Sequence, residues 1–121
     1  MCDPDSLDPA VRQPPYRRVW VRTRGELPDD PLLHAALLVF ATDRTLLRTG
    51  ARPHAPAWQV RHAASIDHAV WLHHPARFDD WVLYVCESPA AAEGRAFASG
   101  AMYARDGRRI ASVAQEGLLR L

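Results

Sequence analysis

The sequence predicts an α+β domain in which an antiparallel sheet wraps around one long central helix. Three observations support this fold class: a long apolar helical stretch over Asp30–Leu47, several β-type stretches after it, and the short turns that separate those stretches. Consecutive strands joined by short turns pair antiparallel. Because an apolar helix and a sheet must cover each other to bury their apolar faces, we expect the sheet to curl around the helix.

The composition limits the classes of function. The 121 residues fit one domain of common size, and fifteen basic and fourteen acidic residues leave a net charge of +1. Without a basic face, no nucleic-acid partner is expected. The six glycines are dispersed, so no phosphate-binding loop is predicted. Two cysteines are too few for a disulfide framework, and no signal-peptide pattern surrounds Asp3 and Asp5. A reduced, cytoplasmic protein is therefore expected.

The N-terminal part of the chain divides into a lead-in and a first strand. Residues 1–15 are rich in Asp and Pro and are expected to form a disordered or extended lead-in, so that the domain spans residues 16–121. Within Tyr16–Thr23, Val19 and Val21 alternate with polar or aromatic residues, which predicts a strand.

The long helix is predicted over Asp30–Leu47. Asp30 is a suitable N-cap, and Pro31 falls at the first helical position, where its missing N–H costs nothing. Only His34 is polar between Leu32 and Ala41, and a helix that is apolar on nearly all sides belongs in a core. The apolar stretch is far shorter than the ~20 residues that cross a bilayer, so no membrane span is expected.

Four β-type stretches follow the helix, each bounded by residues that end strands. Pro75 and Pro89 end the first two, Gly100 predicts a bulge or a close contact in the third, and Asp106-Gly107 predicts a hairpin turn before the fourth. With the helix they make the arrangement called the hotdog fold. The expected strands are Ser65–His73, Trp81–Ser88, Arg95–Arg105 and Arg108–Leu119.

Two polar residues interrupt apolar patterns. Asp43 shares a helix face with apolar residues one turn before and after it. Since a buried carboxylate is costly unless it is hydrogen-bonded, Asp43 either reaches water beside Arg44 or Arg48 or is held in a pocket for chemistry. Gln115 follows Val113 on one face of the last strand by period two. It is either a satisfied core glutamine, a residue of a wet face, or a functional amide.

Other candidate sites fit poorly. Ser65, Asp67 and His68 suggest a Ser-His-Asp hydrolase, but strand alternation would point His68 away from the other two, and the nucleophile-elbow pattern is absent. The six histidines lack metal-type spacing, so no metal site is expected. Ser65 remains as the third off-pattern polar residue. Asp43, Ser65 and Gln115 could converge, since the strands that carry the last two pass over the helix.

The sequence resembles the C-terminal half of acyl-CoA thioesterase II, the TesB-type family. The resemblance covers residues 16–121 and rests on the blocks LLVFATDRTLL, ASIDHAVWLHHP, WVLYVCESPAA, GRAFASGAMYARDG and IASVAQEGLLR. Members of this family are usually double-hotdog chains. Their catalytic Asp, Thr or Ser, and Gln lie in the C-terminal hotdog, and by motif these fall on Asp43, Ser65 and Gln115.

The resemblance implies an enzyme that hydrolyses fatty acyl-CoA to free fatty acid and CoA through an activated water, without a cofactor. Asp43 would take the proton of the water, and Ser65 and Gln115 would orient that water. The family often has Arg where His74 and Ser99 stand here, which weakens the expected site for the CoA phosphates. Arg95 is the candidate contact that remains.

The resemblance also bears on assembly. The chain begins in what resembles the linker between two hotdogs, and a lone hotdog leaves a sheet edge uncovered, so a homodimer or pairing with another hotdog domain is expected. The alternatives are a non-catalytic acyl-CoA-binding or assembly subunit, and a fragment that is inactive without an N-terminal hotdog partner. A hotdog hydratase is disfavoured, because Arg44-Thr45-Leu46-Leu47 follows Asp43 where its signature has a His.

Overall fold

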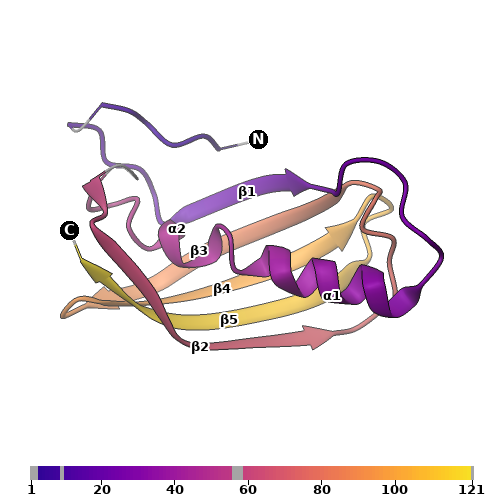
Figure 1. The fold of residues 1–121 in the computed structure, drawn as a ribbon. Coiled ribbons are helices and arrows are strands. Elements are labelled where there is room, and N and C mark those ends of the chain that lie inside the picture. Colours follow the sequence, from indigo (N-terminus) through magenta and orange to yellow (C-terminus); the bar gives the residue numbers. More distant parts are fainter. Residues whose placement is uncertain (1–2, 9, 56–58, 121) are drawn as a thin grey trace.

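The computed structural model describes residues 3–8, 10–55 and 59–120, and it shows a five-stranded sheet with helices against one face (Figure 1). The spatial order is β1-β3-β4-β5-β2, and all neighbours are antiparallel. This confirms the predicted hotdog fold. The strands are β1 (Tyr16–Val21), β2 (His62–Leu72), β3 (Val82–Ala92), β4 (Arg95–Ala104) and β5 (Arg109–Arg120), and the helices are α1 (Pro31–Thr42) and α2 (Leu46–Thr49).

Helix α1 begins where its sequence predicts and ends earlier. The Asp30 carboxylate accepts from the Leu32 backbone N–H at 3.0 Å, and Pro31 occupies the first turn. The predicted continuation to Leu47 is wrong, because residues 43–45 form a turn before α2. In an uninterrupted helix the Thr42 carbonyl would accept from a backbone N–H four residues later. Here it accepts instead from the Tyr84 hydroxyl at 2.8 Å, so the helical ladder stops beside Asp43.

The sheet covers one side of α1, and the other side of the helix is exposed (Figure 1). Leu38 faces the sheet and joins the main core, whereas Leu32 is 77% exposed and Phe40 is 68% exposed. Neither α1 nor any other helix in the described part of the chain has the length and hydropathy that a bilayer crossing needs. The core packed under α1 and α2 consists of Leu38, Leu46, Phe78, Val82, Tyr84, Cys86, Ala98, Met102, Ile110, Ala111 and Val113.

The one polar residue in the apolar part of α1 is buried rather than exposed. His34 donates through Nε2 to the Pro28 carbonyl at 2.8 Å, and its Nδ1 accepts from the Phe78 N–H at 2.8 Å. Since both ring nitrogens are hydrogen-bonded, burial of this histidine carries no unsatisfied polar group. His34 thereby ties the start of α1 to the loop before it and to the loop between β2 and β3.

Two irregularities in the strands were absent from the sequence prediction. Strand β3 continues through Pro89, so the prediction that Pro89 ends this strand is wrong. The register between β3 and β4 shifts between Glu87 and Ala90, and such a bulge tolerates a residue without an N–H. Strand β2 starts at His62 rather than Ser65, and its register with β5 shifts between Ser65 and Asp67.

The hairpin turns follow ordinary turn chemistry. Gly107 has φ +91°, which confirms the turn predicted at Asp106-Gly107. The hairpin between β3 and β4 turns at Glu93 (φ +55°) and Gly94 (φ +76°), the pair of positive φ values that a tight two-residue turn requires.

The N-terminal lead-in has contacts with the domain through acidic side chains. Asp5 lies 3.2 Å from a guanidinium nitrogen of Arg17 and 3.2 Å from one of Arg52, and both arginines are buried. Asp3 pairs with Arg18 at 2.9 Å, and this bond lowers the pKa of Asp3. Residues 3–8 and 10–15 contain no helix or strand. The division into residues 1–15 and 16–121 stays a prediction.

Gly100 provides a test of the packing beneath α1. A Cβ at this position would lie 2.5 Å from the Tyr84 ring, which confirms the predicted close contact. We expect Gly100→Ala to lower the free energy of unfolding by about 1–3 kcal/mol, because the buried ring must shift. Urea unfolding followed by tryptophan fluorescence measures this loss. The neighbouring Ser99→Ala, on the opposite face of β4, should change stability by less than about 0.5 kcal/mol. Equal stability of both variants would contradict the described packing.

Candidate active site

The side chains of Asp43, Ser65 and Gln115 meet at one point, and we call them the polar cluster. Gln115 donates through Nε2 to Asp43 Oδ1 at 2.9 Å and also to Ser65 Oγ. The Ser65 hydroxyl lies 3.4 Å from the same Asp43 oxygen and donates to it. The structure therefore brings together the three residues that the resemblance marked, from the end of α1, from β2 and from β5.

The two oxygens of the Asp43 carboxylate differ in their surroundings. Both donors of the polar cluster reach Oδ1, and Oδ2 accepts no hydrogen bond from any described residue. The Asp43 side chain is 63% exposed, while Gln115 is 1% exposed beneath it. One oxygen is thus fixed from the protein side, and the other is open to a water or a ligand.

A bulge in β2 puts Ser65 on the helix side of the sheet together with His68. Ser65 pairs with Gly117 in β5, and His68 pairs with Gln115, so β2 has one residue more than β5 between these pairs. The extra residue resets the alternation of side chains. The prediction that His68 points away from Ser65 is therefore wrong. Asp67 does point elsewhere, because its carboxylate accepts from the Glu116 N–H at 2.9 Å at the bulge.

His68 belongs to the site although sequence reasoning had set it aside. Its Nε2 lies 2.8 Å from the Thr42 hydroxyl, and its Nδ1 lies 3.9 Å from Asp43 Oδ1. The side chain is 21% exposed, and Nδ1 itself is buried without a hydrogen-bond partner among the described residues. The stretch from Ser65 to His68 contains no glycine or proline, so the sequence carries no signal for the bulge.

Close packing of α2 on β5 sets the position of the turn that carries Asp43. A side chain at Gly117 would collide with both methyl groups of Leu47. Because Gly117 has no side chain, Leu47 of α2 packs directly on β5 at this position. Gly117 is also the residue that pairs with Ser65 of β2. Residues 43–45 are held between this contact and the end of α1.

Arg95 lies away from the polar cluster. It is at the start of β4, 3.6 Å from the Glu116 carboxylate, and it lines a pocket of about 170 Å³ with Gly94, His54 and Leu119. A contact between Arg95 and the CoA phosphates stays a prediction. In the part of the chain that the structure covers, no group of three or more His, Cys, Asp or Glu side chains could hold a metal ion.

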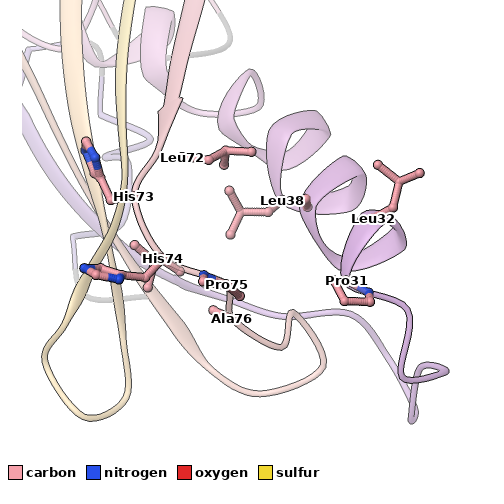
Figure 2. A pocket seen from close by; sticks show the side chains of 10 residues that line it. Pro31, Leu32, Leu38, Leu72, His73, His74, Pro75 and Ala76 are labelled. Atoms are coloured by element: carbon pink, nitrogen blue, oxygen red, sulfur yellow. The ribbon is translucent and has the colours of Figure 1, made fainter.

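An apolar pocket of about 450 Å³ lies between the first half of α1 and the end of β2 (Figure 2). Leu38 and Leu72 face this space from the helix and the strand, and Pro31, Leu32, Pro75 and Ala76 surround it. Leu38 precedes Asp43 by five residues, which is about 7.5 Å along a helix axis. The pocket thus ends roughly one and a half turns from the polar cluster on the same helix.

The comparison with known proteins identifies the family. Residues 11–118 match the family model for acyl-CoA thioesterases. This chain belongs to that family. The acyl-CoA thioesterase match covers both the polar cluster and the apolar pocket, and it confirms the resemblance inferred from the sequence blocks.

Acyl-CoA thioesterases of very different organisms are similar to the chain. It is 37% identical to acyl-coenzyme A thioesterase 8 of Mus musculus over 98% of its own length and 38% of that protein. It is 35% identical to acyl-CoA thioesterase 2 of Haemophilus influenzae over 91% of its own length and 39% of that protein. The crystal structure of acyl-CoA thioesterase II TesB2 from Mycobacterium marinum superposes with a TM-score of 0.81 at 41% identity, over 87% of this chain and 42% of that one. The chain therefore spans about two-fifths of the length of these acyl-CoA thioesterases.

The stability of a Gln115 variant tests whether this buried amide is structural. Gln115 Oε1 is buried without a partner among the described residues, so Gln115→Met removes an unsatisfied oxygen as well as two donated bonds. We expect these effects to offset each other and to change the free energy of unfolding by less than about 1 kcal/mol in urea titrations.

As a control, Gln115→Glu buries a second carboxylate beside Asp43 and should cost more than about 2 kcal/mol. A loss above about 2 kcal/mol for Gln115→Met would identify a structural core glutamine instead.

Proposed function

We propose that this domain hydrolyses fatty acyl-CoA to free fatty acid and CoA, with Asp43 as the general base that activates a water. The observation that carries the proposal is the asymmetry of the Asp43 carboxylate. Oδ1 is held by Gln115 and Ser65, and the rest of the group is exposed. The similarity to proteins named acyl-CoA thioesterases supports the class of substrate.

The chemistry needs one proton acceptor next to the thioester. The water oxygen attacks the thioester carbonyl carbon while Asp43 takes a proton from that water. When the tetrahedral intermediate collapses, the C–S bond breaks, and the proton held by Asp43 goes to the CoA sulfur. A positioned general base of this kind contributes about 10²- to 10⁴-fold in rate. Gln115 and Ser65 keep the carboxylate in one orientation, so the base is already positioned when substrate and water bind.

A covalent acyl-enzyme fits the site less well than an attacking water. The Ser65 hydroxyl donates to Asp43 and accepts from Gln115, so it is held within the polar cluster with one of its two lone pairs occupied. Burial raises the pKa of the Cys86 thiol to about 11, and this residue is fully buried. At neutral pH Cys86 is therefore a neutral, inaccessible thiol.

The two pockets suit the two ends of such a substrate. The apolar pocket near Leu38 and Leu72 would receive the acyl chain. Arg95, whose side chain is 55% exposed, remains the candidate contact for the CoA phosphates. A non-catalytic acyl-CoA-binding subunit would need the pockets but no carboxylate held by two donors, so this alternative is disfavoured.

Assembly with a second hotdog is part of the proposal. Strand β2 is an edge strand, and the outer side of α1 beside it is apolar and exposed. Such an edge and face together match what a second copy or another hotdog domain would cover. The large exposed apolar residues of α1 and β2 are Leu32, Val39, Phe40, Ile66, Trp71 and Leu72.

A cytoplasmic location completes the proposal. Cys86 is a free thiol, and a reducing compartment keeps thiols in this state. The other cysteine, Cys2, lies outside the described residues.

Replacing the proposed base tests the function directly. Asp43→Asn keeps the shape of the side chain but cannot take a proton, so we expect kcat to fall by about 10²-fold or more with the fold intact. The measurement is CoA release from octanoyl-CoA, followed with a thiol reagent, alongside circular dichroism. Asp43 and Arg44 are adjacent and exposed, so Arg44→Gln is the matched control and should retain its rate. Full turnover by Asp43→Asn would rule out this role.

Sedimentation of the pure chain tests the assembly. We expect a dimer at micromolar concentration, weakened by Phe40→Glu, which puts a charge on the exposed apolar face of α1. The control Phe97→Glu changes an exposed residue of β4 and should leave the dimer unchanged. A monodisperse monomer would contradict the homodimer and favour pairing with a separate hotdog domain.

A further inference from the structure

We propose that His68 is a positioning residue, which holds Thr42 and thereby fixes the place of the neighbouring Asp43 carboxylate. The inference rests on the proposed function in taking Asp43 as the base. It goes further by assigning a role to a histidine that touches neither the water nor the substrate. His68 and Asp43 come from different elements, so their distance depends on a contact between β2 and the end of α1.

The hydrogen bonds of the Thr42 hydroxyl show which group donates in its bond with His68. The Thr42 hydroxyl donates to the Val39 carbonyl at 2.6 Å, so it has no hydrogen left for the imidazole. The bond of 2.8 Å between this hydroxyl and His68 Nε2 therefore uses a hydrogen carried by Nε2. Nδ1 is left facing the Asp43 carboxylate at 3.9 Å.

Thr42 is fixed by groups from two strands. His68 of β2 binds its hydroxyl, and the Tyr84 hydroxyl of β3 donates to its carbonyl at 2.8 Å. The residue is completely buried. Because Asp43 is the next residue and caps the helix, any movement of Thr42 displaces the carboxylate. Helix ends fray readily, and this end is held by bonds that an ordinary C-terminus lacks.

The same strand pair positions the carboxylate in two ways. Gln115 and His68 stand opposite each other in the β2–β5 register. Gln115 binds the Asp43 carboxylate itself, and His68 binds the residue before it. One cross-strand pair, Gln115 and His68, therefore holds both the Asp43 carboxylate and the backbone next to it.

A comparison with His34 separates this role from ordinary packing. Both ring nitrogens of His34 are hydrogen-bonded, as expected for a buried structural histidine. His68 leaves Nδ1 buried and unpartnered among the described residues, next to Asp43. A residue kept only for stability gains nothing from an unsatisfied nitrogen at this place. Neither ring nitrogen reaches the exposed side of the carboxylate, so His68 positions the base rather than contacting the reacting atoms.

The test uses paired variants that remove or keep one hydrogen bond. His68→Leu and Thr42→Val delete the contact, whereas His68→Gln and Thr42→Ser keep a donor and a hydroxyl. We expect the first pair to lower kcat for octanoyl-CoA by about 10- to 100-fold with KM nearly unchanged, because the base is misplaced. The second pair should recover most of the rate. His62→Leu, an exposed histidine on the same strand, is the control and should retain full activity.

A second measurement does not depend on activity. Amide hydrogen exchange at residues 41–45 should rise in His68→Leu and Thr42→Val while β3, β4 and β5 stay protected. If the chain has no thioesterase activity, the proposed function fails, but hydrogen exchange still decides whether His68 holds Thr42 in place. Exchange unchanged at residues 41–45 would overturn the proposal, as would kcat within twofold of wild type in both deletion variants. If His68→Leu exchanges faster throughout the sheet, the comparison of Thr42→Ser with Thr42→Val decides between a local role in holding Thr42 and general destabilisation.

Discussion

The pairing of β2 with β5 is the constraint on which the site depends. Because β2 carries one extra residue at its bulge, Ser65 and His68 both face the helix, although they are three positions apart. A regular strand would turn one of them to the other side of the sheet. Gln115 stands opposite His68 in this register. One local irregularity therefore collects from two strands the groups that surround the end of α1.

Buried polar groups are fully hydrogen-bonded at His34 but not in the candidate site. His34 is buried with both nitrogens bonded, and it ties α1 to the preceding loop and to the loop between β2 and β3. In the site, Gln115 Oε1 and His68 Nδ1 are both buried without partners among the described residues. Two such acceptors beside one exposed carboxylate are an unfavourable arrangement for stability alone. Polar groups left unsatisfied in this way are expected where a structure serves function rather than packing.

The sequence determines those features that depend on neighbouring residues. The start of α1 was predictable, because Asp30 and Pro31 act within one turn, and the Asp106-Gly107 hairpin was predictable for the same reason. The end of α1 was not, since it depends on the Tyr84 hydroxyl from a distant strand. His68 was missed because strand alternation was assumed to be unbroken. The polar cluster was suggested by three off-pattern residues and given a role by family resemblance, and only coordinates could show that its members touch.

The exposed side of α1 has a consequence for how such proteins can be built. The side chains of Asp43, Ser65 and Gln115 all come from this one hotdog. A neighbour that covers Leu32 and Phe40 has to supply a complementary surface but none of the cluster. Under the proposed pairing, a covering domain would be constrained by the shape of this surface and not by the polar cluster. Such a domain could then be joined to this one or encoded apart from it without changing the residues of the polar cluster.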